Sequence, residues 1–135
     1  MDNKKEIYNL ENDTRCIEMI QKASLDNKSN SGFKVEKGLL FGTKEWFTAI
    51  DHGLIKKYIV KGVISQLYLY GHNDYPVFEI ENSDGKTKWT QEGTTSEYIH
   101  GRGIELEYVE QRYKRPSDIT GVFSKCILCI RVISG

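Results

Sequence analysis

The spacing of apolar residues changes from a helical to a strand-like period at about Tyr58, and this change decides the fold class. From there on, apolar side chains recur at every second position, as in strands with one buried face. Such strand-like runs lie at 59–70, 75–81, 86–91, 104–108 and 125–133. Because no long helical pattern interrupts them, the sequence predicts an antiparallel β region over 59–135.

The dipeptide Asp84-Gly85 fixes the pairing of two of these strands. It stands between the runs at 75–81 and 86–91. Asp-Gly in this position is typical of the tight turns that close two-residue hairpins. We therefore expect the second and third strands to form a hairpin. Further turns are expected at 71–74 and 116–121.

The first 58 residues predict two helices. Residues 4–23 place apolar side chains near one face of a helical wheel. The second helix has Thr43 as a good N-cap and Gly53 where a helix stops. Its apolar face carries Trp46, which we expect to be buried against the sheet. A short strand over 33–41 is expected between the helices.

The five-strand order over residues 59–134 resembles the OB-fold. The resemblance rests on Gly62 inside a long first strand, on the tight hairpin at Asp84-Gly85, and on Gly103 just before the fourth strand. It implies a small β-barrel, in which many OB domains bind single strands on the face of strands two and three. Gly62 is then expected where the first strand bends.

These patterns together predict one α+β domain over residues 1–135. Two N-terminal helices in a helical region, 1–58, would pack on the β region, 59–135. That region would form a five- or six-stranded antiparallel β-barrel, OB-like, or a β-sandwich. A chain of this length buries enough surface to fold without a disulfide or a structural metal.

Charge and composition restrict the partners. Lys and Arg number 19, as do Asp and Glu, so the formal net charge is zero. A zero balance gives no general attraction to nucleic acid or to an anionic membrane, and it favours self-association over the steering of charged partners. No apolar run reaches the length of a signal peptide core or a membrane span. We therefore expect reduced cysteines and a cytoplasmic location.

The cysteine and histidine positions do not predict a metal or a cofactor. Cys126 and Cys129 have the spacing of half a metal site, but an offset of three on a strand puts them on opposite faces. No second pair completes a four-ligand zinc site. His72 and His100 fall in predicted turns. They leave open a small enzyme that uses a nearby pocket for acid–base catalysis.

The sequence favours a small intracellular binding or interaction module without catalytic activity, with a protein or a second copy of the chain as its partner. The alternative is single-stranded nucleic-acid binding through the OB-like face. Glu79 and Glu81 oppose that use, and we expect Phe78 and Trp89 to be core residues. The candidate binding residues are Tyr68, Tyr75, Trp89, Lys88, Arg112, Lys114 and Arg115.

Overall fold

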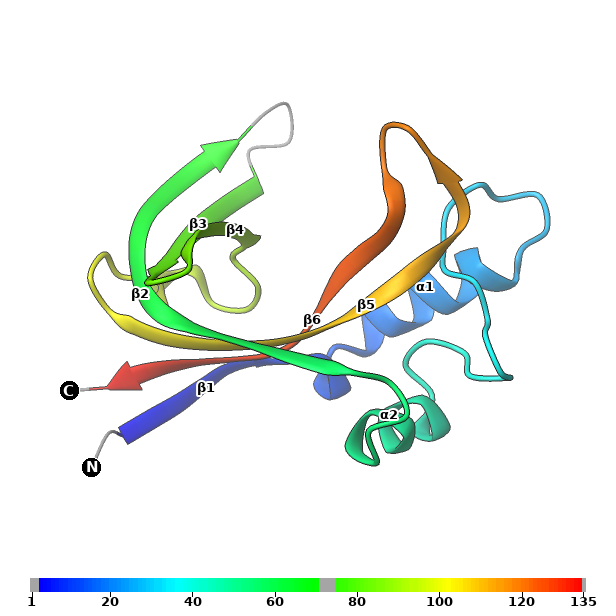
Figure 1. The fold of residues 1–135 in the computed structure, drawn as a ribbon, viewed down its shortest axis with the longest axis horizontal. Helices are drawn as coiled ribbons and strands as arrows, with labels where there is room; N and C mark the ends of the chain where they lie inside the picture. Colours follow the sequence, from blue (N-terminus) through cyan, green and yellow to red (C-terminus); the bar gives the residue numbers. More distant parts are fainter. Residues whose placement is uncertain (1–2, 71–74, 135) are drawn as a thin grey trace. The chain divides into compact units, whose positions relative to one another are not determined.

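The computed structural model describes residues 3–70 and 75–134, which form an α+β fold (Figure 1). The two α-helices are α1 (Thr14–Leu25) and α2 (Lys44–Asp51). Single 3-10 turns occur at Leu10–Asn12 and Thr95–Glu97. The strands are β1 (Asn3–Asn9), β2 (Lys57–Tyr70), β3 (Tyr75–Asn82), β4 (Gly85–Thr90), β5 (Gly103–Ser117) and β6 (Gly121–Ser134).

The strands form one six-stranded sheet in the order β1-β6-β5-β2-β3-β4. β1 and β4 stand at its two edges, and the registers β1–β6, β2–β3 and β3–β4 are antiparallel. The expected α+β class and antiparallel sheet are therefore confirmed. Over the described ranges the sheet is open, in place of the expected OB-like barrel or sandwich.

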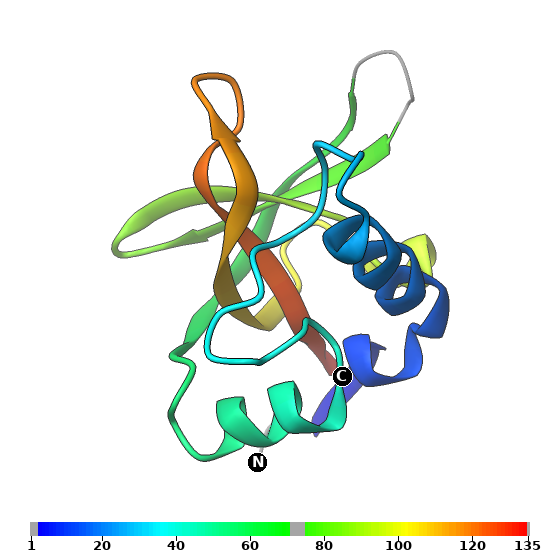
Figure 2. The same cartoon turned by 90° about the vertical axis from the view of Figure 1, so that its right-hand side faces the viewer.

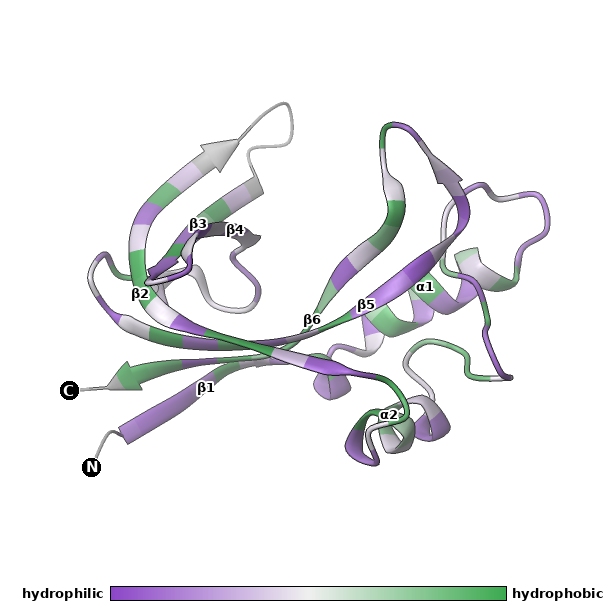
Figure 3. Ribbon diagram, in the orientation of Figure 1, coloured by the Kyte–Doolittle hydropathy of each residue, from purple (hydrophilic) through white to green (hydrophobic). Residues whose placement is uncertain are grey.

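The helix predicted over residues 4–23 is wrong in its first half. Residues 3–9 are strand β1, which pairs with β6 from Asn3↔Ser134 to Asn9↔Cys129. α1 begins only at Thr14, after the Asp13 carboxylate accepts the backbone N–H of Cys16 at 3.2 Å. β1 is mostly hydrophilic (Figure 3), so its short pattern carried little strand signal. The hydrogen-bonding edge of β6 decides its conformation, because tertiary context overrides weak local preference.

The chain divides into two compact units, each assembled from segments that are distant in the sequence. The first unit takes in the described residues of Met1–Asn9, Ile59–Glu107 and Cys129–Gly135. The second unit consists of Leu10–Tyr58 and Tyr108–Leu128. Both helices thus belong to the second unit.

The core of the first unit consists mainly of apolar side chains from its strands. The expected β3–β4 hairpin is confirmed, because Asn82 pairs with Gly85 and Phe78 pairs with Trp89. The rings of Phe78 and Tyr98 lie 4.7 Å apart. The buried apolar side chains of this unit are Ile64, Phe78, Ile80, Trp89, Tyr98, Ile104, Leu106, Cys129, Ile130 and Val132.

Gly62 lies where β2 and β3 approach each other closely. A Cβ atom at this position would lie 2.3 Å from the carbonyl oxygen of Glu81 on β3. The irregularity of β2 lies further on, where its register with β3 shifts between Ile64 and Gln66. The missing side chain therefore permits a close approach of two strands, and the register shift is a bulge-like feature of its own.

An aromatic cluster forms the core of the second unit. Phe41 and Trp46 have ring centroids 4.6 Å apart, and Phe33 bridges Phe41 to Tyr113 of β5 at 5.4 and 5.7 Å. Phe47 meets the edge of Trp46 at 5.0 Å. Trp46 is only 1 % exposed, which confirms its predicted burial.

The strand predicted over 33–41 is reduced to two isolated bridges, Phe33↔Tyr113 and Glu36↔Leu39. The backbone N–H of Lys34 donates to the carbonyl of Arg112, so this segment runs beside β5 for only a few residues. Figures 1 and 2 show the segment 26–43 passing β5 on its way from α1 to α2. Gly32, Gly38 and Gly42 all have positive φ, which prevents a continuous strand.

Candidate functional site

The start of helix α2 places Trp46 at the centre of the second unit. The hydroxyl of Thr43 accepts the backbone N–H of Trp46 at 3.2 Å, as an N-cap residue does. The helix ends at His52, and Gly53 follows with φ +79°. The predicted cap and stop are thus confirmed. They fix Trp46 in the first turn of a short helix.

A tight turn lies opposite, at Glu36–Leu39. The N–H of Leu39 donates to the carbonyl of Glu36 at 2.9 Å, and both central residues have positive φ, Lys37 at 54° and Gly38 at 72°. This is the pattern of a type I′ turn. Among the described residues, Lys37 is the one non-glycine with positive φ. Holding a lysine there costs about 1 kcal/mol.

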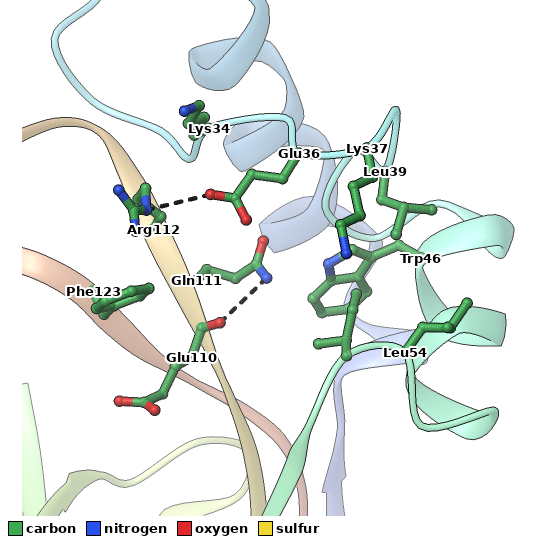
Figure 4. Close-up of a pocket in the computed structure, with 11 residues that line it drawn as sticks. Lys34, Glu36, Lys37, Leu39, Trp46, Leu54, Glu110, Gln111, Arg112 and Phe123 are labelled. Atoms are coloured by element: carbon green, nitrogen blue, oxygen red, sulfur yellow. Dashed lines mark hydrogen bonds and ion pairs between the residues drawn. The ribbon is translucent and has the colours of Figure 1, made fainter.

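Between these elements and β5 lies a cavity of about 400 Å³, which we call the Trp46 pocket (Figure 4). Its apolar walls are Leu39, Trp46, Leu54, Ile55 and Phe123. Its polar rim is Lys34, Glu36, Lys37, Glu110, Gln111 and Arg112. Apolar walls with a few polar groups are the usual character of a binding pocket. A more open hollow between α1 and α2 is lined mainly by polar residues, but about half of its surface is apolar.

The indole nitrogen of Trp46 is an unsatisfied donor inside this pocket. It is buried and has no hydrogen-bond partner. The other tryptophan differs, because the indole N–H of Trp89 donates to Thr87 Oγ1 at 2.8 Å. A buried donor without an acceptor costs about 1–3 kcal/mol. Such a group in a folded protein calls for an explanation.

The charges on the rim do not balance. Arg112 pairs with Glu36 at 3.3 Å and lies 5.2 Å from the ring of Phe123. Glu110 is engaged by Tyr58, whose pKa is raised by that hydrogen bond. Lys34 and Lys37 have no ion-pair partner among the residues that the structure describes. Three cationic and two acidic side chains line the mouth of the pocket, so the rim carries a net charge of +1.

Among the candidate binding residues of the first unit whose side chains are described, no exposed aromatic platform is seen. Trp89 is 7 % exposed, as expected for a core residue. Tyr68 is half-buried and donates to Glu79 at 3.4 Å, and the ammonium of Lys88 lies 5.0 Å from its ring. Glu79 is itself buried and also accepts the hydroxyl of Ser65 at 2.8 Å. The side chain of Tyr75 lies outside the described part of the structure.

The basic cluster predicted at Arg112, Lys114 and Arg115 is divided. Only Arg112 reaches the pocket. The ammonium of Lys114 donates to the carbonyls of Ala23 and Asp26 at the end of α1, at 2.6 and 2.8 Å. Arg115 makes a 3.4 Å contact with the carbonyl of Asn27. Cations at a helix C-terminus stabilise the helix, so two of the three have a structural role.

Cys126 and Cys129 are not activated as nucleophiles. Burial raises the pKa of both Cys126 and Cys129 to about 12. The nearby Cys16 also raises the pKa of Cys126, whereas the thiol of Cys129 donates a hydrogen bond to a carboxylate oxygen of Glu6 at 3.3 Å. The two thiols therefore have different neighbours. Within the described residues, no group of three or more His, Cys, Asp and Glu is arranged to hold a metal.

The structure does not test the histidine pair proposed for acid–base chemistry, because one of its members is not among the described residues. His100 is exposed in the turn before β5. His72 lies outside the described residues.

Sequence reasoning identified Trp46 and Arg112 but missed the pocket that they share. Leu39, Leu54 and Phe123 come from three segments whose meeting no local pattern reveals. The sequence did contain one local signal for the turn. Lys37-Gly38, which stands between Glu36 and Leu39, is a residue followed by glycine and so fits a tight two-residue turn.

Comparison with known protein families gives a match over most of the chain. The family described as Immunity protein RhsI2 matches residues 4–132, which is nearly the whole chain. No curated protein matches the chain. Among the described residues, no helix is both long and apolar enough to cross a membrane.

Proposed function

The chain belongs to the RhsI2 immunity protein family, and from this premise we propose that it binds and neutralises a partner Rhs toxin without catalysing a reaction. The observation that carries the proposal is the family match itself, which spans residues 4–132 and so takes in segments of both units. It agrees with the sequence-based preference for a protein partner.

The Trp46 pocket has the chemistry of a protein-binding site. Interface hot spots are apolar pockets bordered by polar groups, and they are enriched in tryptophan and arginine. Here Leu54 is 78 % exposed and Phe123 about half exposed beside the mouth of the pocket. Large apolar side chains exposed together favour a contact surface.

Single-stranded nucleic-acid binding has weaker support. It requires exposed aromatic side chains and a basic groove. Trp89 is buried, and the ammonium of Lys114 is held by main-chain carbonyls. Two of the candidate residues are therefore committed to folding.

The proposal is tested by co-expression with the toxic domain of the Rhs protein from the same genome. We expect this chain to restore growth, and the purified chain to form a complex with a catalytically inactive toxin in isothermal titration calorimetry. An unrelated Rhs toxin is the specificity control. If neither protection nor complex formation occurs, the proposed function is wrong.

A further inference from the structure

We propose that the Trp46 pocket is the recognition site for an acidic segment of the toxin. An apolar side chain of that segment enters the pocket, and a neighbouring carboxylate accepts hydrogen bonds from the indole N–H of Trp46 and the ammonium of Lys37. The inference rests on the proposed function and specifies which surface of this chain performs it.

The unsatisfied donor is the first argument. The indole nitrogen of Trp46 is buried and has no hydrogen-bond acceptor among the described residues. Lys37 and Trp46 both line the pocket (Figure 4), so a ligand bound there can meet both the ammonium and the indole. A buried donor gains a hydrogen bond when a ligand brings an acceptor to it. A carboxylate brings two acceptor oxygens, enough for both donors.

The charge on the rim is the second argument. Both acidic groups on the rim are engaged, Glu36 by Arg112 and Glu110 by Tyr58. The ammonium groups of Lys34 and Lys37 lack an ion-pair partner among the described residues. Electrostatic complementarity therefore selects an acidic partner, although the chain as a whole has no net charge.

The backbone at Lys37 is the third argument. A lysine in the left-handed region is less favourable than glycine or asparagine. Residues kept in such conformations are concentrated at binding and catalytic sites. A glycine at this position would relieve the strain but would remove the ammonium from the mouth of the pocket. Strain at this residue agrees with a requirement for its charge.

The two tryptophans permit a direct test by nuclear magnetic resonance. A ¹⁵N-labelled sample gives two indole signals, one from Trp46 and one from Trp89. On addition of inactive toxin, we expect the Trp46 indole proton to move downfield as it gains an acceptor. The Trp89 signal is the internal control, because its N–H already donates to Thr87. Trp46→Phe identifies the signals, with circular dichroism checking its fold.

A paired charge experiment measures the contribution of the rim. Lys34→Gln combined with Lys37→Gln should raise the toxin Kd roughly tenfold, with a larger effect at low salt. The matched control, Lys22→Gln with Lys28→Gln, removes the same charge from exposed positions of the same unit. We expect less than about a threefold change in that control.

The outcomes separate this inference from the proposed function. If wild-type protein binds the toxin while the Trp46 signal stays in place and both lysine pairs behave alike, the pocket inference is wrong and the immunity function stands. A Trp46 shift that depends on protein concentration without toxin would assign the pocket to a second copy and overturn the inference. Absence of any toxin binding refutes both proposals.

Discussion

Replacement of Lys114 by methionine should destabilise the second unit far more than its place in a basic cluster implies. Its ammonium donates to the carbonyls of Ala23 and Asp26, which joins β5 to the end of α1. A hydrogen bond from a charged group contributes about 1.5–3 kcal/mol, and favourable helix-end charges about 0.3–1 kcal/mol. One partly exposed ammonium makes both bonds, so the contributions are not additive. We expect a loss of about 2–3 kcal/mol.

The matched control is Arg115→Met. Arg115 makes one exposed contact of 3.4 Å, so we expect a change below about 0.5 kcal/mol. Urea denaturation followed by far-UV circular dichroism measures both variants. For a chain of this length Lys114→Met should also lower Tm by roughly 6–12 °C. Equal stability of the two variants would refute the structural role of Lys114.

Three further predictions concern stability and reactivity. The hydrogen-bonded ion pair with Lys4 at 2.7 Å lowers the pKa of Glu105 below its ordinary 4.5. Glu105 therefore stabilises the fold above that pH and loses this contribution as pH falls, so Glu105→Gln should flatten the acid side of a pH-stability curve measured in urea. Cys126 and Cys129 should resist iodoacetamide at pH 8 until the protein is denatured, and mass spectrometry showing native labelling of either would contradict their raised pKa values. Gly62→Ala should destabilise by about 2–4 kcal/mol in urea denaturation, because its Cβ meets the β3 main chain, and a near-neutral variant would exclude that close contact.

The sequence predicted the elements whose signals are local. Alternating side chains and the Asp84-Gly85 turn gave the β3–β4 hairpin, and Thr43 and Gly53 gave the bounds of α2. These features depend on neighbouring residues alone. The burial of Trp46 followed from its place on the apolar face of that helix.

The missed features depend on contacts between distant segments. β1 forms because β6 offers it an edge, and nothing within residues 3–9 indicates that partner. Barrel closure was inferred from a strand order, but closure is decided by whether the two edge strands meet. The Trp46 pocket combines α2, the turn at Lys37 and the β5–β6 hairpin, so its location required a structure.

The pairing of β1 with β6 has a consequence for the time at which the protein becomes active. Asn9 and its partner Cys129 are separated by 120 residues, so β1 cannot dock during synthesis until nearly all of the described chain has been made. Translation at about 5–20 residues per second makes that delay on the order of ten seconds, and non-local strand pairing is slow in itself. Under the proposed function, a newly made chain therefore protects the cell only after β6 has been made and has paired with β1, and a producer cell needs immunity protein in reserve before the toxin is folded.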